Sequence, residues 1–107
     1  MVIQENNMKS RKMVVRTSEL HLDGDYEGWS FVAKMNPKMK VLESLSTEGI
    51  ANTIKGLSGI LISWNFVDEE GNELAPPGVE TIGELTSDLV TQVTSKYLEE
   101  LSSLNPK

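Results

Sequence analysis

The sequence predicts an α+β domain: a small, mainly antiparallel three-stranded sheet with short helices and a long C-terminal helix packed on one face. Three stretches alternate between apolar and polar residues, which predicts strands. Near the end of the chain, apolar residues recur at spacings of three and four, which predicts a helix. The length of 107 residues is that of one domain. We expect a flexible N-terminal arm over residues 1–10, which are polar and aperiodic, and a single domain over 11–107.

The first two strands are expected to form an antiparallel hairpin. One runs from Met13 to Leu22 and the other from Tyr26 to Met35. Between them lies Asp23-Gly24-Asp25, whose residue types accept the positive φ of tight turns. A loop of two or of three residues fits this turn, so the register stays open. The apolar positions of the second strand share one face: Trp29, Phe31, Ala33 and Met35.

Two short helices and a third strand are expected next. Asn36 is a typical N-cap and Pro37 suits the first helical position, which predicts a helix over 37–45. A second helix is expected to begin after Ser46 or Thr47 and to end at a glycine. The most apolar stretch, 60–67, predicts a central or near-central strand. One face of that strand would carry Ile60, Ile62, Trp64 and Phe66.

After one helical turn over Thr81–Leu85, the longest helix is expected to begin at Thr86, with Asp88 complementing the helix dipole. Asn105-Pro106 would end it. Its apolar stripe either packs on the sheet of its own chain, which we favour, or docks on a partner helix. The stripe consists of Val90, Val93, Tyr97, Leu101 and Leu104.

The charge balance argues against nucleic acid as a partner. The chain carries 10 Lys and Arg against 16 Asp and Glu, a net charge of −6, which phosphate backbones repel. No stretch approaches the roughly 20 apolar residues of a membrane span, so we expect no membrane partner. The first residues lack the apolar core of a secretory signal, and we expect the protein to stay in the compartment where it is made.

Several residues resemble parts of metal or catalytic sites. Asp23, Asp25, Glu27 and Gly28 match the start of a calcium-binding loop, but Lys34 occupies the position of its bidentate glutamate. The flanking sequence also predicts strands, so we expect a hairpin turn. An acidic pair of Asp23 and Asp25 in a hydrolase is the weakest alternative, since a turn holds both carboxylates in water.

The sequence offers no histidine or cysteine that would form a reactive centre. His21 is the only histidine, and on a strand it would face away from Ser18. There are no cysteines, which removes thiolate metal sites and cysteine nucleophiles. We therefore expect a protein without enzymatic activity, with no catalytic residue, metal or cofactor.

One region resembles the small tail assembly chaperones of long-tailed bacteriophages and prophages. Trp64-Asn65 stands in a strand, followed by the acidic turn Asp68 to Gly71, the link Pro76-Pro77 and the C-terminal helix. The resemblance covers roughly residues 26–104. It implies a non-enzymatic protein of the bacterial host cytoplasm that binds tape measure and tail tube proteins during tail assembly and then leaves.

On this interpretation a long helical partner would bind apolar residues of the first short helix and the last helix. Self-association is a further possibility. The alternative is a small permanent structural protein of the phage particle, a tail or head–tail connector component. The residues expected to bind the partner are Met39, Leu42, Leu45, Val93, Tyr97 and Leu101.

Overall fold

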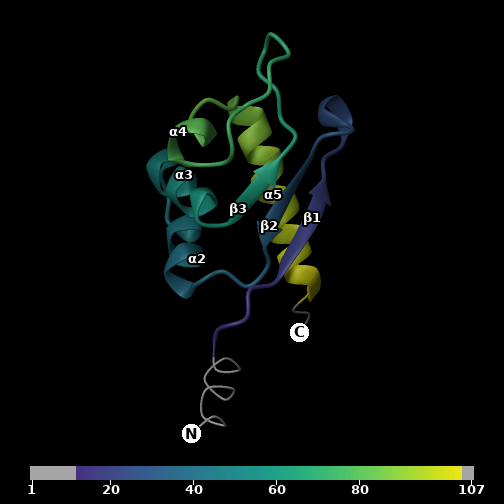
Figure 1. The fold of residues 1–107 in the computed structure, drawn as a ribbon. Coiled ribbons are helices and arrows are strands. Elements are labelled where there is room, and N and C mark those ends of the chain that lie inside the picture. Colours follow the sequence, from purple (N-terminus) through teal and green to yellow (C-terminus); the bar gives the residue numbers. More distant parts are fainter. Residues whose placement is uncertain (1–11, 105–107) are drawn as a thin grey trace, which may run out of the picture.

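A three-stranded antiparallel sheet lies at the centre of the computed structural model, which describes residues 12–104 (Figure 1). The strands follow the order β1-β2-β3 across the sheet, so β2 is central. With the helices described below, the sheet confirms the predicted α+β class. The strands are β1 (Thr17–His21), β2 (Ser30–Lys34) and β3 (Leu61–Trp64).

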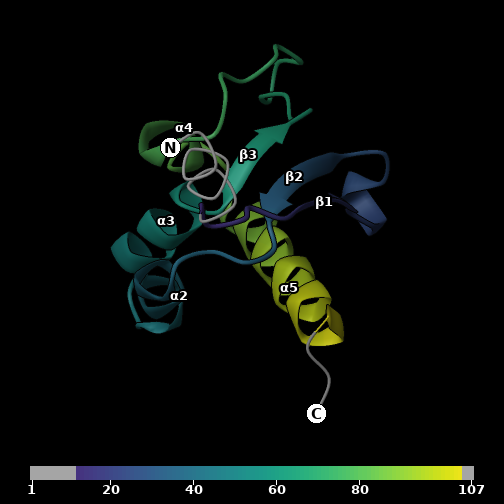
Figure 2. The ribbon, with the colours of Figure 1, turned by 60° about the horizontal axis from the view of Figure 1, so that its bottom comes forward.

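The long helix α5 crosses one face of the sheet, while α2, α3 and α4 gather beside β3 (Figures 1 and 2). The second view shows α5 running obliquely under the strands. The long helix therefore packs on one face of the sheet, as predicted, whereas the short helices lie beside β3. The helices are α2 (Met39–Ser46), α3 (Ile50–Ser58), α4 (Val79–Ile82) and α5 (Ser87–Leu104).

The interior lies between α5 and the covered face of the sheet. Phe31 and Ala33 of β2 meet Val93 and Tyr97 of α5 in one continuous cluster, and all four are buried. The alternation predicted for β2 is therefore confirmed at these positions. The aromatic residues form part of this core: Phe66 is buried, while Trp29 and Trp64 are half-buried and pack against Phe66 at ring-centroid distances of 5.3 and 4.8 Å.

The hairpin loop is longer than the two or three residues predicted. The last ladder bond joins Leu22 N to Trp29 O, and the loop Asp23–Gly28 contains the 3-10 turn η1 (Gly24–Tyr26). Contacts with α5 hold this loop: Asp23 N donates to Gln92 Oε1 at 3.1 Å. Local turn preferences cannot predict a contact between residues so distant in the sequence.

The first strand also begins later than predicted. Met13, Val14 and Val15 precede β1 and are exposed. Asn36 holds this segment by its side chain: Nδ2 donates to Val14 O at 2.6 Å, and Oδ1 accepts from Arg16 N at 2.8 Å. Asn36 is therefore not the N-cap of the first short helix.

The boundaries of the two short helices also differ from those predicted. α2 begins at Met39 with Lys38 as its N-cap, and Thr47 is its C-cap rather than the start of the next helix. Gly49, with a φ of 123°, is the N-cap of α3. Thr86 O accepts from Val90 N, as expected at the start of the last helix. The arm over 1–10 and the stop at Asn105-Pro106 lie outside the described residues.

The third strand lies at the edge of the sheet, not at its centre. The β2–β3 register shifts between Val32 and Ala33, which pair with Ser63 and Leu61. Ile62 is the extra residue of this bulge. Because a bulge changes which residues face the core, Leu61 is buried and Ile62 is 42% exposed, against the predicted shared face of Ile60 and Ile62.

Candidate partner-binding surface

The residues that resembled catalytic and metal sites hold the hairpin in place or face solvent. Asp23 Oδ2 accepts from Lys96 Nζ at 2.9 Å, which ties the loop to α5. His21 lies exposed on the uncovered sheet face, where its Nε2 is 3.9 Å from Glu19 Oε1. Within residues 12–104, no three acidic, histidine or cysteine side chains converge in a geometry that would hold a metal ion.

No helix within residues 12–104 combines the length and apolarity needed to cross a bilayer. The longest, α5, presents a buried face to the sheet and exposed acidic residues to solvent, including Glu99.

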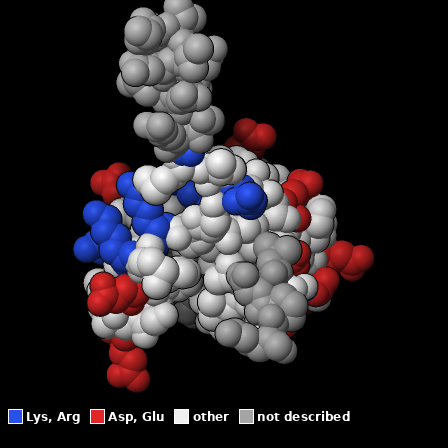
Figure 3. Space-filling model, turned by 90° about the horizontal axis from the view of Figure 1, so that it is seen from below, with Lys and Arg blue, Asp and Glu red and all other residues white. Residues whose placement is uncertain are grey.

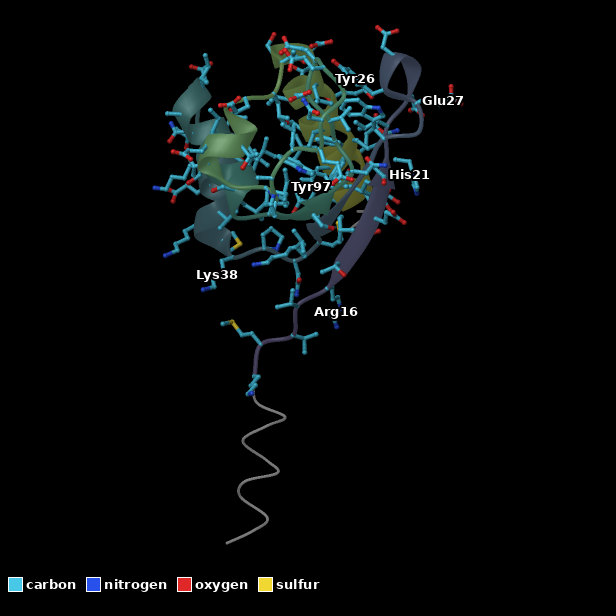
Figure 4. All side chains as sticks on the ribbon, turned by 45° about the horizontal axis from the view of Figure 1, so that its top comes forward. Arg16, His21, Tyr26, Glu27, Lys38 and Tyr97 are labelled. Carbon is cyan, nitrogen blue, oxygen red and sulfur yellow. The ribbon has the colours of Figure 1, made fainter. Side chains whose placement is uncertain are left out.

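The structure divides the six residues expected to bind a partner into two groups. Val93 and Tyr97 are fully buried beneath the sheet, and Tyr97 Oη donates to Lys34 O at 2.8 Å (Figure 4). A partner cannot contact them while the domain is folded, so this part of the prediction is wrong. Val93 and Tyr97 of the α5 stripe therefore pack on the sheet of their own chain, the alternative that we favoured.

The remaining four expected residues differ in exposure. Leu45 and Leu101 pack against the core as partly buried residues, and Leu42 is half-buried. Met39 is 78% exposed at the start of α2. Met39 is thus the most accessible of the six, and a partner could also contact the uncovered parts of Leu42.

A groove that the sequence pattern did not reveal lies where α3, the α4 turn and the start of α5 meet. We call it the α3–α5 groove. Its volume is about 480 Å³. Only uncharged residues line it: Gly49, Ile50, Thr53, Ile54, Ile82, Gly83, Leu85, Ser87, Val90 and Thr91.

Local helix geometry explains how the groove is built. Ile50 and Ile54 are four residues apart and so lie on one side of α3. Ile50 lies at the edge of the groove and is 81% exposed, whereas Ile82 of α4 is buried, with only 1% of its surface exposed. Val90 contributes from the first turns of α5. The site therefore combines a solvent-facing apolar rim with a buried base.

The spacing of Ile50 and Ile54 was visible in the sequence, and it predicted a helix face. It did not predict which part of that face stays uncovered. The deciding feature is tertiary: α4 and the residues after it, among them Gly83 and Leu85, approach α3 from a distant part of the chain. No local pattern encodes that approach.

Charges are unevenly placed on the surface. Figure 3 shows basic side chains gathered on the α2 side of the lower face, with acidic ones around the rim. Lys40 and Lys55 line the same shallow depression on α2 and α3. In Figure 4, Arg16 and Lys38 lie at the end of the molecule opposite Tyr26 and Glu27. A partner therefore meets different charge at the two ends.

Comparison with protein-family models, with curated proteins and with solved structures finds no match for this chain.

Proposed function

We propose that this chain is a non-enzymatic protein-binding domain that acts as a phage tail assembly chaperone. Its partners would be the tape measure and tail tube proteins, and it would act in the cytoplasm of the bacterial host. The α3–α5 groove is the observation that supports binding most directly. The segment Ile62 to Pro77, with its resemblance to tail assembly chaperones, supports the assignment to tail assembly.

The groove suits an apolar helical stripe. A helix presents apolar side chains at spacings of three and four, and such side chains dock in apolar grooves. Ile50 and Ile54 provide a rim of matching spacing. Because no charged residue lines the groove, an apolar stripe enters without burying an unpaired charge.

A transient complex also requires that the free protein remain in solution. Exposed apolar side chains such as Ile50 and Val79 promote association, whereas a net charge of −6 opposes it.

The test is co-purification of the full chain with a fragment of a phage tape measure protein, followed by affinity measurement. We expect Ile50→Glu to weaken binding at least about tenfold, because it places a charge in an apolar contact. Ile50 is exposed, so the variant should retain its thermal stability.

Two matched variants locate the site. Leu98→Glu changes an exposed apolar residue on α5 outside the groove and should bind like the wild type. Met39→Glu tests the α2 surface expected from the sequence. Loss of binding by Met39→Glu with full binding by Ile50→Glu would contradict the groove as the contact surface.

The composition of finished particles separates the chaperone from a structural component. A chaperone leaves during assembly, so purified tails should lack this protein by mass spectrometry. Its presence at stoichiometric levels would overturn the chaperone proposal in favour of a permanent particle component.

A further inference from the structure

A second concave site, separate from the α3–α5 groove, lies between the hairpin loop, the acidic turn after β3 and the start of α5. Its volume is about 210 Å³. That volume is below the roughly 300–1,000 Å³ typical of pockets for whole small-molecule ligands, and it suits one side chain. We call it the Tyr26 pocket.

Two aromatic residues line the Tyr26 pocket. Tyr26 and Trp29 meet edge to face, with ring centroids 5.0 Å apart. The tyrosine hydroxyl is held in place, since it lies 3.1 Å from Asp88 Oδ2 and 3.2 Å from Thr86 Oγ1, and Thr86 also lines the pocket. Trp29 packs on Phe66 of the core. The aromatic wall is therefore fixed before any ligand arrives.

Three acidic residues line the same pocket: Asp68, Glu69 and Glu84. No lysine or arginine lines it, and within residues 12–104 none of the three forms an ion pair. Backbone N–H groups of Asn72 and Glu70 lower the pKa of Asp68, so this carboxylate stays charged at neutral pH.

The surroundings of Asp68 argue against a metal ion as the ligand. Its Oδ1 already accepts the backbone N–H groups of Glu70 and Asn72, both at 2.9 Å. Within the described part of the chain, no three potential ligands converge here. The combination of aromatic rings with carboxylates that form no ion pair within residues 12–104 instead matches an organic cation.

We propose that the Tyr26 pocket binds an arginine side chain of a protein partner. Arginine fits both features of the site, because its planar guanidinium stacks on aromatic rings and donates to carboxylates through several N–H groups. This inference goes beyond the groove, since a partner that docks its apolar stripe there need not reach the pocket.

The experiment uses the full chain, labelled with nitrogen-15, and the peptide acetyl-Gly-Arg-Gly-amide. We expect saturable shifts of the Trp29 indole N–H with a dissociation constant of about 1–10 mM, since each single contact is weak. The Trp64 indole, which donates to Ala75 O at 3.0 Å, is the internal reference and should shift little.

A neutral peptide and a matched variant test the role of charge. Citrulline in place of arginine keeps the shape but removes the charge, and should bind at least about fivefold more weakly. Glu84→Gln should also weaken binding about threefold or more, whereas Glu80→Gln, an exposed glutamate on α4 outside the pocket, should not.

Three outcomes would overturn the proposal: no saturable shift at 20 mM peptide, equal binding of the citrulline peptide, or equal effects of Glu84→Gln and Glu80→Gln. None of them bears on the α3–α5 groove. Conversely, full binding of the tape measure fragment by Ile50→Glu would count against the groove and says nothing about the Tyr26 pocket, so the two proposals fail independently.

Discussion

The hydroxyl of Tyr97 donates to the backbone carbonyl of Lys34 at 2.8 Å, joining the middle of α5 to the last residue of β2. The two residues are far apart in the sequence, and the bond connects the helix directly to the sheet on which it packs. Because the side chain is fully buried, this bond is shielded from competing water.

Replacing Tyr97 by Phe should keep the ring packing and leave the Lys34 carbonyl without its donor. We expect a loss of about 1 kcal/mol in the free energy of unfolding, which corresponds to a fall of about 4–8 °C in Tm. Thermal denaturation followed by circular dichroism measures it. Leu98→Ala, at an exposed position on the same helix, should change Tm far less.

The same tyrosine should make stability sensitive to high pH. Burial raises the pKa of Tyr97 from 10.0 to about 12. In the unfolded chain the hydroxyl loses its proton near pH 10, whereas the folded chain retains it, so its contribution is complete below pH 10 and is lost as pH rises toward 12. Urea denaturation across this range should show a steeper loss of stability for the wild type than for Tyr97→Phe. Parallel curves would contradict the buried environment.

Because α2 and α3 approach closely, replacing each of two glycines by alanine should destabilise the protein to a different extent. A Cβ at Gly56 would lie 2.9 Å from the backbone N of Leu45, and a backbone cannot move aside easily. A Cβ at Gly59 would meet methyl groups of Val41 at 3.1 and 3.2 Å, and a side chain can shift. We expect Gly56→Ala to lower the free energy of unfolding by about 1–3 kcal/mol and Gly59→Ala to lower it clearly less. Urea denaturation measures both. The reverse order would contradict the described packing.

The acidic turn after β3 should respond to acid. Hydrogen bonds from the backbone N–H groups of Asn72 and Glu70 lower the pKa of Asp68 below 3.8. Its stabilising contribution is therefore present above pH 3.8 and is lost as pH falls below that value. Asp68→Asn keeps an acceptor oxygen without the titration. Its stability should fall less than that of the wild type between pH 4.5 and 2.5 in urea denaturation.

The Asn36 side chain hydrogen-bonds both Val14 O and Arg16 N, and we call this pair of bonds the Asn36 clamp. Its removal should change amide exchange locally. Without it, Arg16 N loses its acceptor, and the exposed segment Met13–Val15 loses a contact with the domain. In Asn36→Ala the amide of Arg16 should exchange with solvent about fivefold faster or more, as expected for one lost hydrogen bond. Asn52→Ala removes only a contact to Glu48 O, just before the start of its own helix, and should leave the exchange of Arg16 unchanged. Equal exchange in both variants would contradict the clamp.

Local patterns predicted the elements of the fold because each has a period that the sequence displays. The alternation around Phe31 and the three-four spacing around Val93 and Tyr97 both mark buried faces, and both are buried. Local patterns could not predict the bulge at Ile62 or the Asn36 clamp, since both depend on a partner segment elsewhere in the chain.

The candidate surfaces were harder to predict for the same reason. A stripe of apolar residues says that one helix face is buried, but not whether the chain itself or a partner buries it. Val93 and Tyr97 turned out to be core, whereas Ile50 stayed exposed beside α4. Only the packing of α3, α4 and α5 distinguishes the two cases.

The most direct test of the central claim, that this domain binds a helical partner through the α3–α5 groove, is a map of amide shifts on addition of the tape measure fragment. We expect the largest shifts at Ile50, Ile54, Gly83 and Val90, and small ones at Leu98. Shifts confined to α2 around Met39, or no shifts at a saturating fragment concentration, would contradict it.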